Sequence, residues 1–334
     1  MKTRICAIAK DEGAYIADWI FHHIYFGFDE LHIYLNRTTD LSEEILRAIM
    51  CTYPKVTYEK LDWIDNCPPE MRKRLQVLAY GKDLEVARSN NIDWWMCLDI
   101  DEFWVPRDFD TTIKNYVRLF PSDRPICFLW HNVLGEAVSF KPLSPNSSYV
   151  ITPQIKTITP VKSVNIEFVR VHKPKYSKNV SPINADGHTM KFSEAVDQRA
   201  DPSMKSVCGA YIAHQMYRSE AEYLATMIRG RPNEKKTLKT NRPGYKAKDY
   251  DSNHDSFAWP KLSYDSYVNA KNEFYQNIGV DEIVAVEKDN VKLNSSKVID
   301  VVRKILDDEN KNNILKALTG TQLHTKVKDL VERR

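Results

Sequence analysis

The first hundred residues alternate short apolar runs with segments of helical periodicity, and this alternation narrows the possible folds more than any other feature. The apolar runs are 5–9, 31–35, 56–61 and 94–100. The helical segments between them are 12–26, 41–50 and 69–88. Short apolar runs of this kind are typical of buried parallel strands, which need a crossover helix between them. The pattern therefore predicts an α/β fold with a Rossmann-like, mostly parallel sheet flanked by helices.

The rest of the chain has a different pattern. Residues 106–214 are rich in Pro, Ser, Thr and Val and contain short β-like runs, and Ser219 to Glu222 has the capping-box spacing that opens a helix. A polar, basic stretch follows, and beyond residue 280 the sequence is typical of amphipathic helices. We expect one domain over 1–235, with halves 1–105 and 106–235. A polar linker and a C-terminal helical extension would occupy 236–334.

Charge and glycine content exclude several classes of protein. The chain has 48 Lys and Arg against 45 Asp and Glu, a net charge of +3, so no nucleic-acid partner is expected, because phosphate neutralisation needs a basic surplus. Only 10 residues are Gly, and neither GxGxxG nor GxxxxGKS/T occurs. No apolar run approaches the roughly 18 residues of a membrane span. None of the six cysteines forms a CxxC pair, and free thiols suit a reducing compartment, so we expect a cytoplasmic protein.

The acidic segment Asp99-Ile100-Asp101-Glu102 follows directly on the apolar run 94–100. If the strand continues through it, alternation puts Asp99 and Asp101 on one face, roughly 6–7 Å apart. Carboxylates crowded at a strand end repel one another unless a cation lies among them, and hard oxygen ligands suit Mg²⁺ or Mn²⁺. Ligands of open α/β sheets bind beyond the carboxyl ends of the strands, where this segment would lie. A solvated acidic turn is the alternative.

Several segments together resemble a known enzyme family. Lys10-Asp11-Glu12-Gly13, then Ala17 to Ile20 and His23, is similar to the opening motif of family 2-like glycosyltransferases, including the related family 92. Asp99 to Phe103 reads DIDEF, which that family also carries, and 214–230 resembles a later family signature. The resemblance implies a fold of the GT-A type, which binds a nucleotide sugar, a UDP-sugar above all, through Mn²⁺ or Mg²⁺.

The resemblance also implies roles for individual residues. The metal ligands would be Asp99, Asp101 and His214. Residues near the nucleotide sugar would be Lys10, Glu12, Asn36, Arg37, Asp40, Asp99 and Lys156. Each has an ordinary structural alternative, such as a first-turn acid, a helix cap or a solvated surface residue.

The related families invert the anomeric centre, which requires a carboxylate base within reach of the acceptor hydroxyl. Glu102, Glu136 and Asp186 are the candidates, and the sequence does not choose among them. The expected activity is hexosyl transfer to an acceptor hydroxyl, in the family context of bacterial capsule or lipopolysaccharide synthesis. An Mg²⁺-dependent nucleotidyltransferase and a non-catalytic sugar-nucleotide binding module are the alternatives.

The expected partners are a nucleotide-sugar donor and a saccharide or lipid-linked saccharide acceptor. The C-terminal segments 297–307 and 325–334 alternate cations with apolar residues. Such helices rest on the inner face of an anionic membrane, form a homodimer contact or pack on the protein core. The sequence favours core packing and leaves the other two open.

Overall fold

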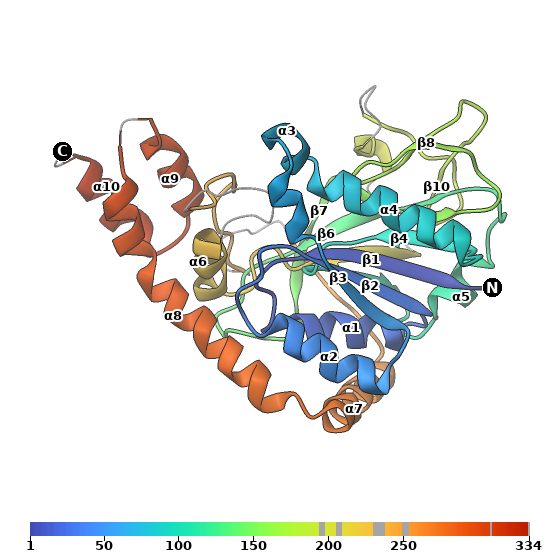
Figure 1. The fold of residues 1–334 in the computed structure, drawn as a ribbon, viewed down its shortest axis with the longest axis horizontal. Coiled ribbons are helices and arrows are strands. Elements are labelled where there is room, and N and C mark those ends of the chain that lie inside the picture. The colour runs from blue at the N-terminus through green and yellow to red at the C-terminus, as the bar shows by residue number, and fades with distance from the viewer. Residues whose placement is uncertain (194–197, 205–208, 230–237, 249–253, 308, 333–334) are drawn as a thin grey trace.

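The computed structural model describes residues 1–193, 198–204, 209–229, 238–248, 254–307 and 309–332. Its N-terminal part is a parallel sheet in the order β3-β2-β1-β4, with β1 (Thr3–Ala9), β2 (Glu30–Leu35), β3 (Val56–Lys60) and β4 (Trp94–Cys97). The connecting helices are α1 (Ile16–Tyr25), α2 (Ser42–Thr52), α3 (Pro69–Arg72) and α4 (Leu75–Ser89), with the short helix η1 (Asp62–Asn66) before α3. Figure 1 shows α1 and α2 below this sheet and α4 above it. The predicted α/β fold is confirmed.

The sheet continues on the far side of β4 with mixed strand directions. Its order is β4-β7-β6-β11-β5, and β11 is parallel to β6 but antiparallel to β5. The strands are β5 (Glu102–Pro106), β6 (Ile126–Val133), β7 (Ser148–Pro160) and β11 (Ala210–His214), with β10 (Ile183–Asn184) and β12 (Asp255–Ser256) at the margins. Three smaller elements, α5 (Ile113–Val117), β8 (Ile166–Phe168) and β9 (Lys175–Tyr176), and the turn η2 (Pro202–Met204) complete this part. Residues 106–214 thus form the mixed sheet and long loops that their composition predicts.

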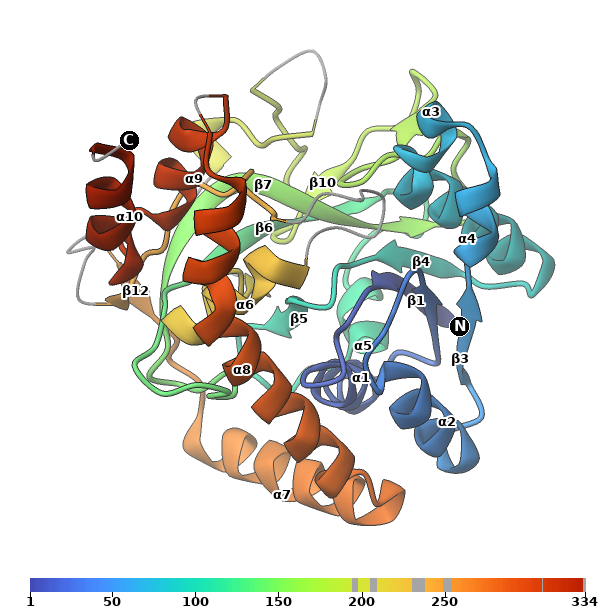
Figure 2. The ribbon, with the colours of Figure 1, turned by 60° about the vertical axis from the view of Figure 1, so that its left-hand side comes forward.

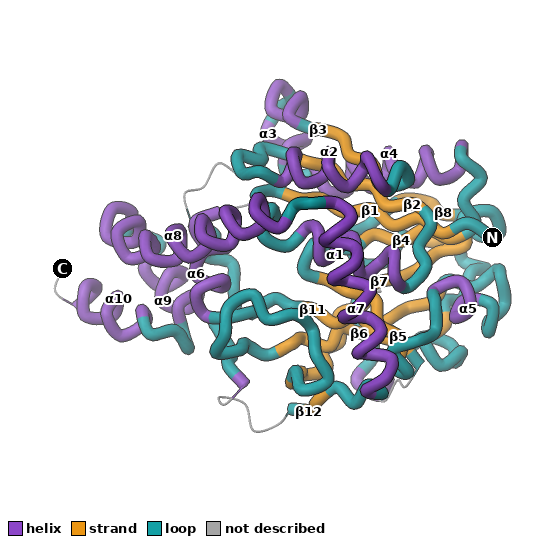
Figure 3. The backbone as a smooth tube through the Cα atoms, turned by 90° about the horizontal axis from the view of Figure 1, so that it is seen from below, coloured by secondary structure: helices purple, strands orange, loops and turns teal. Residues whose placement is uncertain are grey.

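The C-terminal helices lie beneath α1 and α2 and beyond one end of the sheet (Figure 1). They are α6 (Glu220–Arg229), α7 (Lys261–Ile278), α8 (Asp281–Ile305), α9 (Lys311–Leu318) and α10 (Leu323–Glu332). Helix α7 crosses beneath α1 and α2 and buries Tyr267, Phe274 and Ile278 in the same apolar core as the sheet (Figure 3). Helix α8 runs past α6 towards α9 and α10 (Figure 2), and these helices share a second core. The predicted C-terminal helical region is confirmed, and the boundary near residue 235 stays a prediction.

Helix α8 also reaches the loops that follow β1 and β2. The Glu287 carboxylate accepts a hydrogen bond from the Leu41 amide at 3.1 Å. A Cβ atom on Gly13 would lie 2.7 Å from Cγ of Glu287, so the helix can approach only because this residue is glycine. None of the described helices is both long and apolar enough to cross a membrane.

Two sequence predictions of local structure are wrong. Residues 69–88 form two helices, α3 and α4, in place of one. The apolar run 94–100 is a strand only as far as Cys97, and Asp99 to Asp101 form a turn that leads into β5. The apolar pattern of the sequence extends to residue 100 because Leu98 and Ile100 are buried in the core, although neither lies in a strand.

Candidate functional site

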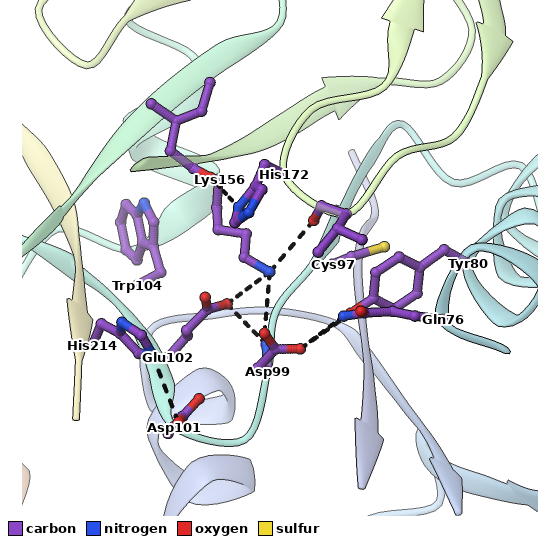
Figure 4. Close-up of polar contacts among 12 residues, drawn as sticks. Gln76, Tyr80, Cys97, Asp99, Asp101, Glu102, Trp104, Lys156, His172 and His214 are labelled. Carbon is purple, nitrogen blue, oxygen red and sulfur yellow. Dashed lines mark hydrogen bonds and ion pairs between the residues drawn. The ribbon is translucent and has the colours of Figure 1, made fainter. Parts of the chain in front are cut away.

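The turn after β4 sets the geometry of the acidic segment. The Asp99 amide donates to the Glu102 carboxylate at 2.9 Å, and the Glu102 amide donates to the Asp99 carbonyl at 3.0 Å. These two bonds close the turn. The predicted arrangement of Asp99 and Asp101 on one strand face is therefore wrong, and the two side chains have different neighbours (Figure 4).

The Asp99 side chain is held from two sides. The Gln76 amide donates to its Oδ1 at 3.0 Å, and the Tyr80 hydroxyl donates to the same atom at 3.4 Å. The Lys156 ammonium lies 3.6 Å from its Oδ2. Helix α4 and strand β7 thus fix the carboxylate that the sequence assigned to the metal and the nucleotide.

Beneath the turn lies a buried ion pair. The Lys156 ammonium and the Glu102 carboxylate are 3.0 Å apart, and both side chains are fully buried. Burial raises the pKa of Glu102 to about 7 in spite of the neighbouring cation. Burial would lower the pKa of Lys156, but Asp99 and Glu102 raise it above its ordinary value. Lys156 therefore holds the two carboxylates from below.

Asp101 faces His214 at the carboxyl end of β11. The His214 Nε2 lies 3.6 Å from the Asp101 carboxylate, and Nδ1 lies 3.0 Å from Oδ1 of Asn132. The sheet register places His214 beside Asn132 of β6, which accounts for the second contact. An amide oxygen only accepts, so Nδ1 carries the proton in neutral imidazole and Nε2 presents a lone pair.

The pairing has an electrostatic consequence. Burial alone would raise the pKa of the Asp101 carboxyl, but His214, Arg218 and Arg242 together hold it well below its ordinary value. A carboxylate and an imidazole lone pair that face each other are repulsive unless a proton or a metal ion lies between them. Asp101 and His214 therefore fit two ligands of a divalent ion, with Asn132 orienting the imidazole.

The predicted third ligand is elsewhere. No group of three His, Cys, Asp or Glu side chains arranged to hold a metal occurs among the described residues. Asp99 is turned towards Gln76 and Lys156, because the turn separates it from Asp101. The remaining positions of an ion at Asp101 and His214 would go to water or to the ligand.

These side chains line a cavity of about 550 Å³, within the usual range for small-molecule sites. One wall carries Asp99, Asp101 and His214, with the Trp130 ring 4.2 Å from the His214 ring. The lining also includes four cations and one further acid: Lys10, Arg229, Lys239, Arg242 and Glu12.

The cations that line the cavity are not equally neutralised by neighbouring acids. The Arg229 guanidinium pairs with the Glu12 carboxylate at 2.5 Å, and the Lys10 ammonium donates to the Arg229 carbonyl at 2.6 Å. Burial raises the pKa of Glu12 even so. Lys10 and Glu12 therefore line the cavity, and Arg229 compensates the buried acid. Their contact with a nucleotide sugar stays a prediction.

Arg242 is the exception. Its side chain is 7% exposed, and one terminal nitrogen donates to the Met216 carbonyl at 2.8 Å. Its Nε has no hydrogen-bond partner, and within the described ranges no carboxylate forms an ion pair with it. Burial lowers the pKa of this guanidinium. The Asp101 carboxylate acts on this cation electrostatically without forming an ion pair, so the Nε–H of Arg242 is available to donate to an anionic ligand.

Three residues predicted near the nucleotide order loops beside the cavity. The Asn36 amide donates to the Leu61 carbonyl at 3.2 Å, and Nε of Arg37 donates to Asp65 at 2.8 Å. The Asp40 carboxylate accepts from the amides of Gly13 at 2.7 Å and Ser42 at 3.0 Å. None of the three lines the cavity.

The three base candidates also lie outside the cavity lining. Glu102 is beneath the turn, bound to Lys156. Glu136 pairs with Lys141 at 2.9 Å beside a small adjoining hollow. Asp186 accepts from the Gly209 amide at 2.8 Å, at the start of β11, about 16 Å of strand away from His214. Neighbouring lysines thus engage Glu102 and Glu136, and Asp186 lies at the far end of β11 from His214.

Sequence reasoning missed Gln76, Asn132 and Arg242. The first lies on a helix without a motif, and the second is placed by pairing between distant strands. Arg242 lies in a polar stretch in which nothing marks one cation as buried.

With this geometry established, the comparison with known families is informative. The model for glycosyltransferase family 92 matches residues 6–199, more than half of the chain. The chain therefore belongs to glycosyltransferase family 92, and we describe it as a glycosyltransferase. None of the curated proteins compared with it matches. The matched range contains Asp99, Asp101 and Lys156, whereas His214, Arg229 and Arg242 lie beyond it.

Proposed function

We propose that this protein transfers a hexosyl group from a nucleotide-sugar donor, with a UDP-sugar favoured, to an acceptor hydroxyl, with inversion and with Mn²⁺ or Mg²⁺. The observation that supports the proposal is the cavity, which is lined both by Asp101 and His214 and by the buried Arg242, whose Nε has no hydrogen-bond partner. A metal-bound diphosphate complements both kinds of group. The acceptor would be a saccharide or a lipid-linked saccharide, in bacterial surface polysaccharide synthesis.

Asp101 and Nε2 of His214 would hold the metal ion. An imidazole ligand favours Mn²⁺ over Mg²⁺, which prefers an all-oxygen shell. When bound, the ion supplies positive charge that stabilises a departing diphosphate. Asp99, fixed by Gln76, Tyr80 and Lys156, would accept hydrogen bonds from donor hydroxyls.

The cations of the cavity would act on the same leaving group. Arg242, Arg229 and Lys10 line the cavity together with the aspartates and would neutralise the charge that develops on the diphosphate. The Trp130 ring offers an aromatic face against which a base or a sugar would stack.

The test is a donor screen in the presence of Mn²⁺ that measures release of nucleoside diphosphate by slow hydrolysis. We expect release from one class of nucleotide sugar and a UDP-dependent rise in melting temperature that requires the metal ion. The isosteric Asp101→Asn variant should lose both. The matched control, Asp123→Asn at an exposed position, should keep both.

Two outcomes would contradict the proposal. Release of inorganic diphosphate from a nucleoside triphosphate, without nucleoside diphosphate from any sugar nucleotide, would identify a nucleotidyltransferase. Tight binding of UDP without turnover of any donor would identify a binding module.

A further inference from the structure

A projecting segment beside the cavity exposes apolar side chains. We call residues 62–74, which include η1 and α3, the arm (Figure 1). Trp63 is 51% exposed and Met71 is 44% exposed, and Leu78 on the first turns of α4 is 38% exposed. The other six tryptophans of the chain are buried or partly buried. An exposed Trp and Met on neighbouring one-turn helices form an apolar patch without a partner in the monomer.

The arm is anchored, so the exposure of Trp63 belongs to the fold. The Arg37 amide donates to Asp62 at 2.8 Å, and the Arg37 side chain binds Asp65. Ile64 is buried in the core against α4. Since Ile64 points inwards on a short helix, Trp63 beside it is directed outwards.

The arm also carries a run of cations. Arg72, Lys73 and Arg74 follow Met71 directly, and Lys73 and Arg74 are exposed. Of the acids of the arm, Asp62 and Asp65 accept hydrogen bonds from Arg37, and Glu70 is exposed beside Met71. An exposed Trp and Met beside three consecutive cations are typical of surfaces that bind an anionic membrane, where the ring lies at headgroup level and the cations meet lipid phosphates.

The arm leads directly into residues that line the cavity. Leu75 and Gln76, the residues that follow the arm, line the cavity, and Gln76 binds Asp99. A membrane that contacts the arm would therefore lie beside the cavity. The C-terminal helices differ, because Val298, Val302, Ile314 and Val327 are buried in the core that they share with α6.

We propose that the arm docks this protein on an anionic membrane surface, with Trp63 and Met71 among the lipid headgroups and Arg72 to Arg74 against the phosphates. The docking is independent of the proposed reaction. It would bring a lipid-borne acceptor to the cavity without requiring diffusion through bulk solvent.

The experiment is co-sedimentation of the full chain with vesicles of phosphatidylglycerol and phosphatidylcholine, compared with vesicles of phosphatidylcholine alone. We expect binding to the anionic vesicles that weakens as salt is added. Lipids brominated in the acyl chain near the headgroup should quench the fluorescence of Trp63, and Trp63→Phe should remove that quenching. Trp63→Ser should lower vesicle binding roughly tenfold. Arg74→Ser should lower it roughly fivefold, the effect of one cation near an anionic surface.

The matched control is Leu262→Ser, which removes an 80% exposed leucine at the start of α7 and should bind vesicles as the wild type does. Equal thermal melting of all variants would show that they are folded. Wild-type protein that stays in the supernatant, or Trp63→Ser that binds normally, would overturn the proposal. So would a concentration-dependent dimer in sedimentation velocity that Trp63→Ser abolishes without any vesicle binding, because the arm would then bind a second copy. None of these outcomes depends on turnover of a sugar nucleotide.

Discussion

His131 of β6 is stacked between aromatic rings of the two neighbouring strands. The pH dependence of stability at this residue tests the packing quantitatively. Its ring is 4.2 Å from that of Tyr211 and 4.4 Å from that of Tyr149, and it is nearly parallel to both. The side chain is buried, and its Nδ1 has no hydrogen-bond partner. Burial lowers the pKa of His131 from 6.5 to about 3. The imidazole is therefore neutral in the folded protein at neutral pH.

The lowered pKa makes stability depend on pH in a defined direction. Between pH 6.5 and pH 3 the unfolded chain binds a proton at this position and the folded chain does not. The free energy of unfolding is therefore complete above pH 6.5 and falls as the pH falls. A pKa difference of this size corresponds to a loss of about 2 kcal/mol at pH 5 and about 3 kcal/mol at pH 4, relative to pH 8.

His131→Phe keeps an aromatic ring in the stack and removes the titrating group. Urea unfolding of the wild type and the variant at pH 8, 6, 5 and 4 measures the effect. We expect the variant to be at least as stable at pH 8 and to lose about 2 kcal/mol less than the wild type by pH 5. His188→Phe, at an exposed position, should leave the wild-type pH dependence in place. If the curves of the wild type and His131→Phe run parallel, the argument from burial is refuted.

Three further substitutions test other features of the structure. Lys156→Met should lower the free energy of unfolding, measured in urea titrations, by about 3–5 kcal/mol, because it leaves the buried Glu102 carboxylate without a partner. Adding Glu102→Gln should recover most of the lost free energy. Equal stability of the single and the double variant would count against the buried pair. Arg242→Met should raise the melting temperature of the free protein while UDP affinity, measured by calorimetry, falls at least tenfold; a lower melting temperature with unchanged affinity would indicate a purely structural arginine. Gly13→Ala should destabilise by about 1–3 kcal/mol, since its methyl group would lie 2.7 Å from Cγ of Glu287 and 2.9 Å from the Asp40 carboxylate. Gly81→Ala, whose methyl group would make an ordinary 3.6 Å contact with Val169, should be neutral or stabilising in the same denaturation assay.

The parallel half of the fold was predictable because its signals are local. Strand and helix periodicities alternate up to residue 97, although η1 and α3 make the stretch between β3 and α4 irregular. The edge of the sheet that carries Asp99 and Asp101 followed from the same pattern. The end of β4 was not predictable, because Leu98 and Ile100 are buried in the core whatever the backbone does. The apolar pattern shows which residues are buried, but it does not show where the strand ends and the turn begins.

The positions of His214 and Arg242 in the cavity depend on contacts between distant parts of the chain. His214 was identified by resemblance, but its orientation comes from Asn132, 82 positions away on a neighbouring strand. Arg242 is buried because it lies against α6, with its guanidinium over the Tyr223 ring. No local pattern separates this arginine from the solvated cations around it, so its burial requires the tertiary structure.

The extent of the family match has a practical consequence for protein engineering. It stops at residue 199, after the turn that holds the two aspartates and before the segments that supply His214 and Arg242. Chimeras that exchange everything after this point between family members would keep the lining contributed by Lys10, Glu12 and the acidic turn and would replace the lining contributed by the later segments. Such hybrids would need a compatible partner for Asn132, and they would separate the contributions of the two parts of the chain to ligand binding.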